Sequence, residues 1–297
     1  MIAAGSWAHA AYETAAALER ADASARVLTA RTEARGLGRA SGFSDLARIA
    51  PAGLVPPSGR AAAHLADLLE VAAAAAAAAE GLDDQVAEAV TRSAAELTRV
   101  AAGSGALDPG GVARMARRAI GSVRGLADHT MPRDEPWQLL RLGTFLTRAG
   151  WTGALLAGGA AAGPGGDWEL GPWSAIAAVC GAAGDACEAD GALEIVTRLL
   201  TDRRLPAGHA LAVAEVEASL AALSRGAGGG PAPALARLAA SRLRDPELPR
   251  RIEHSLQALL AEQVDAVAAI ERAAIGMARG PEPLATLLAG DHIAATS

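Results

Sequence analysis

Apolar residues recur every three or four positions along most of this chain, which is the spacing of an amphipathic α-helix. The first such stretch places Ala10, Leu18, Ala21, Ala25 and Leu28 on one approximate stripe. Nowhere does apolar and polar alternation persist over a bounded β-branched run, so no β-strand is expected. The pattern therefore predicts an all-α fold, a multi-helix bundle.

Start and stop signals divide this pattern into about ten helices. Ser6, Ser58 and the Asp108-Pro109 pair are typical helix starts, and Gly81 and Gly280-Pro281 are typical ends. We treat residues 1–297 as a single helical domain, with 281–297 as a short C-terminal extension. The predicted helices run over residues 6–35, 58–80, 83–102, 108–128, 134–157, 173–189, 191–202, 206–225, 232–244 and 248–279.

An internal repeat relates two of these helices. Residues 18–28 match residues 146–156 at a constant offset, so that Arg20 corresponds to Arg148. Similar helices within one chain indicate a pseudo-symmetric bundle in which they face each other. We therefore expect the first and fifth helices to turn their polar faces onto a shared cleft.

Composition excludes several classes of function. Hydrophobic residues make up 51% of the chain but aromatic residues only 3%, so the core must consist of small aliphatic side chains that let helices approach closely. Every one of the 27 basic residues is Arg, and Lys is absent. A P-loop, a Schiff base or a kinase site would need that amine. The net charge of -6 argues against a nucleic-acid partner.

Targeting and metal signals are weak. The N-terminus lacks a basic region, and the apolar tract 71–79 ends at Glu80, short of the roughly 20 residues that a membrane span requires. We therefore predict a soluble, cytoplasmic protein without a membrane partner.

Since no Glu-x-x-His pair occurs, and the histidines are scattered, we expect neither a metal nor another cofactor.

The candidate polar residues lie on the first helix and around the start of the fifth. Glu19, Asp22 and Arg26 are spaced i, i+3 and i+7, which places them on one helix face. An exposed Asp22–Arg26 ion pair is the simpler alternative, and Asp134 is equally suited to cap its helix. Arginines can present forked donors to a carboxylate or phosphate, and Arg20 with Arg148 is the best pair for a symmetric anion site. The proposed ligand- or partner-binding residues are Glu19, Arg20, Asp22, Arg26, Arg133, Asp134, Glu135, Arg141 and Arg148.

Three segments resemble the Alpha-E family of bacterial all-α domains. They are Leu-Glu-Arg-Ala-Asp at 18–22, the stretch 130–143 with Arg133-Asp134-Glu135 and Trp137, and the Asp202-Arg203 turn before Leu205-Pro206. The resemblance implies association with circularly permuted ATP-grasp proteins, and hence a role in an amide-ligase or peptide-synthesis system. In the second repeat, however, Thr147 and Gly150 replace the acidic residues that the family pattern places there.

Two functions are compatible with these residues. The first is a non-catalytic accessory subunit that binds a circularly permuted ATP-grasp-like protein or its peptide product. The alternative is an enzyme in which Glu19, Asp22, Arg133 and Asp134 assist amide formation or acyl transfer by acid–base catalysis. The loss of acidic residues at Thr147 and Gly150 favours the first, so that the isolated chain is expected not to be an enzyme. The sequence does not show which of these residues would be catalytic.

Overall fold

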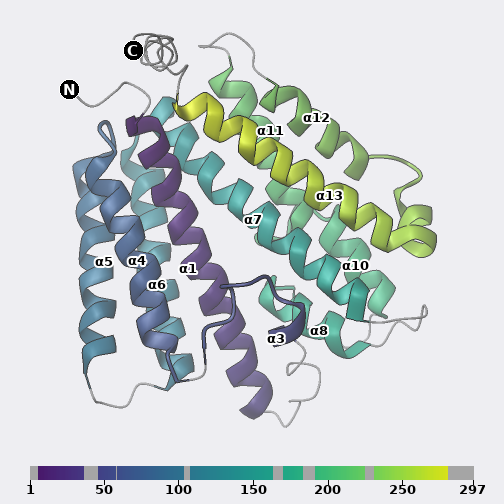
Figure 1. Ribbon diagram of the computed structural model, residues 1–297, viewed down its shortest axis with the longest axis horizontal. Coiled ribbons are helices and arrows are strands. Elements are labelled where there is room, and N and C mark those ends of the chain that lie inside the picture. Colours follow the sequence, from purple (N-terminus) through teal and green to yellow (C-terminus); the bar gives the residue numbers. More distant parts are fainter. Residues whose placement is uncertain are drawn as a thin grey trace, which may run out of the picture.

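Two long helices, α1 (Ser6–Gly36) and α7 (Glu135–Ala162), lie side by side at the centre of the molecule (Figure 1). The computed structural model describes residues 6–36, 46–57, 59–103, 108–162, 170–182, 191–224 and 231–279. Within these ranges the chain forms eleven helices and no strand, which confirms the all-α prediction.

The remaining helices flank this central pair in two groups. Helices α4 and α6 pack against α1, and α5 packs on their outer side (Figure 1). Helices α11 and α13 pack against α7, with α12 on their outer side, and three short helices lie near the C-terminal half of α7. The bounds are α3 (Leu46–Ile49), α4 (Ala61–Ala78), α5 (Asp84–Ala102), α6 (Pro109–Thr130), α8 (Leu170–Val179), α10 (Ala192–Thr201), α11 (His209–Leu223), α12 (Ala232–Leu243) and α13 (Leu248–Arg279).

Helix α1 is buried on nearly all sides, and it is rich in alanine, whose small side chain lets neighbouring helices approach closely. Its residues from Ala8 to Ala30 are almost all buried, and they contact helices of both flanking groups. A helix that is covered all round has no solvent face to hold its polar residues. Glu19 and Asp22 are therefore carried into the interior and need partners there.

The repeat prediction is confirmed in its packing. Gly143 in α7 corresponds to Ala15 in α1, and a Cβ added at Gly143 would lie 3.2 Å from the Ala15 Cβ. Further along both helices, the Arg148 and Trp151 side chains bond to Glu19. The two related helices thus run in the same direction and face each other.

Several predicted boundaries are confirmed and others are wrong. Asp83 and Asp108 accept hydrogen bonds from backbone amides in the first turns of α5 and α6, as start signals should. The helix predicted over 173–189 begins at Leu170 and ends at Val179, where Gly181 adopts a φ of 73°. Helix α7 continues to Ala162, and α13 is kinked at Ser255.

Other differences concern the loops. The short helix α3 was not predicted, because four residues carry too little periodicity to be recognised. Helix α4 begins at Ala61, preceded by Arg60 without a side-chain cap. The predicted cap Ser58, most of the loop 36–42 and the C-terminal extension 281–297 lie outside the described residues.

Helix α4 is long and apolar enough to cross a membrane by length and composition, with a mean hydropathy of 1.4 over Ala61–Ala78. A buried helix of a folded core passes the same test. One third of this helix is buried, and it packs against α1 and α5 through Leu65, Leu69 and Ala72. The expectation that the chain has no membrane partner stays a prediction.

A glycine at the α1–α7 contact tests this packing. A Cβ on Gly143 would lie well inside van der Waals distance of the Tyr12 carbonyl oxygen, which belongs to the backbone and cannot move aside alone. We expect Gly143→Ala to lower the free energy of unfolding by at least about 2 kcal/mol, because overpacking forces two central helices apart. Urea unfolding followed by circular dichroism measures this change.

Gly121→Ala is the matched control. Gly121 lies in α6 with nothing within 4 Å of an added Cβ, so alanine should stabilise the helix by roughly 0.5–1 kcal/mol. Equal effects of the two substitutions would contradict the close approach of α1 to α7.

Candidate functional site

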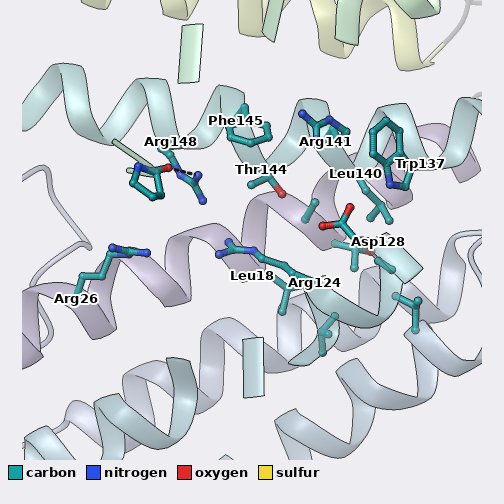
Figure 2. A pocket seen from close by; sticks show the side chains of 16 residues that line it. Leu18, Arg26, Arg124, Asp128, Trp137, Leu140, Arg141, Thr144, Phe145 and Arg148 are labelled. Carbon is teal, nitrogen blue, oxygen red and sulfur yellow. Dashed lines mark hydrogen bonds between the residues drawn. The ribbon is translucent and has the colours of Figure 1, made fainter. Parts of the chain in front are cut away.

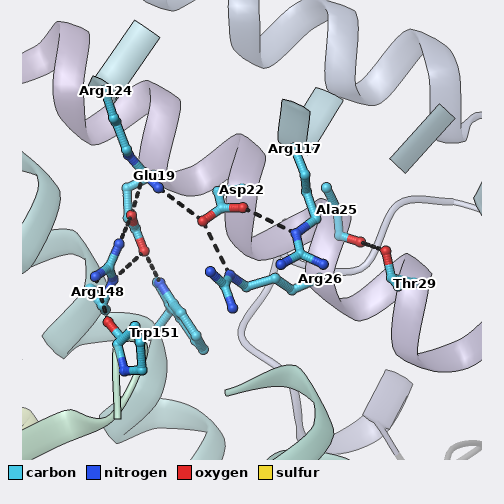
Figure 3. A network of polar contacts seen from close by, with 10 residues as sticks. Glu19, Asp22, Ala25, Arg26, Thr29, Arg117, Arg124, Arg148 and Trp151 are labelled. Carbon is cyan, nitrogen blue, oxygen red and sulfur yellow. Dashed lines mark hydrogen bonds and ion pairs between the residues drawn. The ribbon is translucent and has the colours of Figure 1, made fainter. Parts of the chain in front are cut away.

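The Glu19 carboxylate is the most enclosed charged group of this region, with no exposed surface. Arg148 donates to it in a bidentate fork, from Nε to Oε1 at 2.8 Å and from Nη2 to Oε2 at 2.6 Å. Trp151 Nε1 donates to Oε1 at 3.1 Å, and Arg124 Nη2 donates to Oε2 (Figure 3). Four donors on two oxygens satisfy a carboxylate fully, which makes its burial tolerable.

Asp22, one helical turn further along α1, has the same kind of surroundings. Its carboxylate accepts from Arg26 Nε at 3.1 Å and Arg124 Nη1 at 3.0 Å, with Arg117 Nε 3.6 Å away (Figure 3). Burial acts to raise the pKa of Asp22, but the guanidiniums of Arg124 and Arg26 outweigh it and hold this pKa below its ordinary value. Asp22 is therefore ionised throughout the neutral range.

Three helices supply this network. Helix α1 contributes Glu19, Asp22 and Arg26 from one face, as their spacing predicted, and α6 contributes Arg117 and Arg124, two turns apart. Among the described residues, four guanidiniums surround two carboxylates, which leaves a surplus of two positive charges. The alternative of an exposed Asp22–Arg26 ion pair is wrong in one respect. The two side chains do form the pair, but it is buried, since the Asp22 side chain is only 5% exposed.

Arg148 completes the network from α7 and also closes it toward α11. Its Nη1 donates to the Pro206 carbonyl at 2.7 Å. Burial acts to lower the pKa of Arg148, but the Glu19 carboxylate outweighs it and raises this pKa above the ordinary value. The guanidinium therefore stays charged although it is buried.

A pocket of about 290 Å³ opens beside this network (Figure 2). Arg26, Arg124 and Arg148 gather at one end of it, while Asp128, Trp137 and Arg141 lie at the other. Aliphatic side chains form much of the wall between the two ends. The lining residues are Thr14, Ala15, Leu18, Arg26, Val86, Val123, Arg124, Ala127, Asp128, Trp137, Leu140, Arg141, Thr144, Phe145, Arg148 and Pro206.

One wall of the pocket is a stripe of alternating aromatic and arginine side chains on α7, which Arg133, just before this helix, continues outside the pocket. The Arg133 and Arg141 guanidiniums lie 4.2 and 4.7 Å from the Trp137 ring centroid. Those of Arg141 and Arg148 lie 5.1 and 5.0 Å from that of Phe145. These distances allow cation–π attraction, which holds the guanidiniums in place along the wall. Arg141 also bonds to Glu215 of α11.

The structure brings some of the predicted residues together and leaves others apart. Glu19, Asp22, Arg26 and Arg148 share the buried network, and Arg141 lies in the pocket wall. Arg133, Asp134 and Glu135 are exposed at the start of α7, where Arg133 bonds to Asp128.

The pairing of Arg20 with Arg148 in one anion site is not formed. Arg20 bonds to Glu13 at 3.1 Å and does not line the pocket, whereas Arg148 bonds to Glu19. The symmetric counterpart of the Arg148–Glu19 pair would join Arg20 to position 147. Thr147 offers no carboxylate there, so the Arg20 side chain turns to another acid on its own helix.

Sequence reasoning missed Arg117, Arg124 and Trp151. The two arginines are seven residues apart on a strongly amphipathic helix, a spacing that could have flagged a charged face opposite Glu19 and Asp22. Trp151 stands within the second repeat, opposite the polar face of the first. Among the described residues, no group of three or more His, Cys, Asp or Glu side chains is placed to hold a metal ion.

The Alpha-E family model, described as a predicted alpha-helical domain with a conserved ER motif, matches residues 58–275. The chain belongs to the Alpha-E family. This Alpha-E protein has Glu-Arg pairs at 19–20, before the matched span, and at 271–272, within it. Neither a curated protein nor a solved structure matches the chain.

The pH dependence of stability tests the Asp22 contacts. Since its pKa in the folded protein lies below the ordinary 3.8, the contacts stabilise the fold above that pH. This stabilisation is lost as the pH falls from about 4 through the lower, folded-state pKa, because the unfolded chain takes up the proton first. We expect Asp22→Asn to be about 3 kcal/mol less stable than wild type at pH 7, with a difference that shrinks below pH 4.

Urea unfolding at a series of pH values measures this difference. Asp265→Asn, which changes an exposed carboxylate on α13, is the control and should stay within about 0.5 kcal/mol of wild type. A difference between wild type and Asp22→Asn that stays constant down to pH 2 would show that Asp22 gains nothing from its guanidinium partners.

Proposed function

We propose that this Alpha-E protein is a non-catalytic accessory subunit of an ATP-grasp-type amide-ligase system for peptide biosynthesis. It acts by binding a circularly permuted ATP-grasp-like protein or the peptide that this ligase makes. The association comes from the family resemblance, and the pocket between α1, α6 and α7 supports a binding role for this chain.

The observation that carries the proposal is that hydrogen-bond donors occupy both oxygens of the buried Glu19 carboxylate. A general base must have a lone pair within reach of the proton that it removes. Glu19 accepts from Arg148, Arg124 and Trp151 and has no exposed surface. Its carboxylate is thus suited to hold arginines in position and unsuited to proton transfer.

The arrangement on which the enzyme alternative depends is not formed. That alternative requires Glu19 and Asp134 to face each other across a closed pocket. Asp134 is exposed at the start of α7 and does not line the pocket, so its carboxylate does not face Glu19. The binding function is accordingly the better supported of the two.

The exposed residues at the start of α7 offer a contact for a partner protein. Arg133 lies over Trp137, which lines the pocket, and Asp134 and Glu135 follow it on the surface. Charged rims of this kind steer association and select partners more than they add affinity. We propose that the ligase contacts this rim while its product reaches the pocket.

Affinity purification from the native cell tests the proposal. A tagged chain should recover an ATP-grasp-like protein in near-equal amount by quantitative mass spectrometry. Arg133→Glu should lower that recovery severalfold, because it reverses one rim charge. Arg92→Glu, a charge reversal at an exposed position of α5, should leave recovery unchanged.

Two results would contradict the accessory role. One is a chain that is purified repeatedly without any ligase. The other is formation of amide bonds by the purified chain alone.

A further inference from the structure

The pocket holds more positive charge than the groups around it neutralise. We propose that it binds an oxyanion, a carboxylate or a phosphate, carried on an apolar group of about the size of one ring. This inference rests on the proposed function in taking the pocket as a binding site, and it adds the chemical class of the ligand.

The first support is the charge balance. The described charged residues that line the pocket, counted with the network and the groups that form ion pairs with them, include six guanidiniums and four carboxylates, a surplus of two positive charges. They are Arg26, Arg117, Arg124, Arg133, Arg141 and Arg148 with Glu19, Asp22, Asp128 and Glu215. Arginine cannot relieve such a surplus by releasing its proton, so the pocket stays positive at all ordinary pH values and favours an anion.

The second support is the set of donors that still lack an acceptor. Arg124 Nε is buried and has no hydrogen-bond partner among the described residues. Among the residues that the structure describes, Arg26 donates only through Nε, to Asp22, and its two terminal nitrogens have no acceptor. Both guanidiniums lie at the end of the pocket where Arg148 also points (Figure 2). An oxyanion placed there would accept from fixed, charged donors.

The third support is the shape and lining of the remaining space. A volume of about 290 Å³ is at the small end of ligand pockets, enough for one ring or one branched side chain beside the oxyanion. Leu18, Val123, Leu140 and Phe145 supply an apolar wall for that group. The terminal residue of a peptide, or a phosphate ester of similar size, has this combination.

Isothermal titration calorimetry with three probes tests the proposal on the purified chain. N-benzoylglycine carries a carboxylate and one ring, and phenyl phosphate carries a phosphate and one ring. N-benzoylglycinamide has the shape of the first probe without its charge. We expect at least one anionic probe to bind and the amide to bind at least about tenfold more weakly, since charge-assisted bonds exceed neutral ones.

Two variants locate the binding. Arg26→Gln removes one donor and should weaken binding by about tenfold or more. Thr144→Phe fills the pocket from α7 and leaves every charge in place, so it should abolish binding. It tests the site independently of Arg26→Gln, which removes a buried ion pair and could disturb the fold. Arg92→Gln removes one exposed arginine and should bind as wild type does.

The two anionic probes also separate the two sources of oxyanion. Tighter binding of N-benzoylglycine assigns a peptide carboxylate, and tighter binding of phenyl phosphate assigns a phosphate ester. The proposal is overturned if neither probe binds at millimolar concentration, or if Thr144→Phe binds them as wild type does. If the chain binds a probe but recovers no ligase, the oxyanion site stands and the accessory role is contradicted. If it recovers a ligase but binds no probe, only the oxyanion site is contradicted.

Discussion

The rest of the structure depends on one constraint, a carboxylate with no access to water at the centre of an alanine-rich bundle. Moving an unpaired charge into such an interior costs many kcal/mol, so Glu19 can be ionised there only with its donors in place. Arg148 from α7 and Arg124 from α6 supply these donors. The same contacts therefore fix how α6 and α7 are arranged around α1.

This constraint explains why the pocket is rich in arginine. Together, the four guanidiniums that reach Glu19 or Asp22 bring more N–H donors than the two carboxylates can accept. Arg124 is the clearest case, because it bridges both acids and still keeps Nε without a partner among the described residues. A network built to neutralise buried acids thus leaves positive charge along a pocket, in a protein whose net charge is -6. Binding of an anion follows more directly from this arrangement than acid–base catalysis does.

Much of the fold could be predicted from periodicity and capping residues. Asp83 and Asp108 mark true helix starts, and the repeat correctly placed α1 against α7. The sequence could not show that α1 is covered on all sides, because alanine is compatible with both exposed and buried helix faces. That coverage turned an apparent surface pair, Asp22 and Arg26, into part of the buried network.

The candidate site was predicted in part for a related reason. Spacing along one helix identified Glu19, Asp22 and Arg26, but it says nothing about which residues of another helix will meet them. Arg117 and Arg124 were missed on that account. Asp134 and Glu135 were expected in the site because they belong to the polar segment at the start of the fifth predicted helix. They lie at the N-terminus of α7, where both side chains are exposed.

A double-mutant cycle on Glu19 and Arg148 tests most directly whether this buried pair holds the helices together. The free energy of unfolding would be measured for wild type, Glu19→Gln, Arg148→Gln and the double variant, with Glu88→Gln and Arg92→Gln as the exposed control pair. We predict a coupling of about 1–3 kcal/mol for the buried pair and about 0.5 kcal/mol or less for the control. Effects of Glu19→Gln and Arg148→Gln that add within about 0.5 kcal/mol would contradict the central role of their contact.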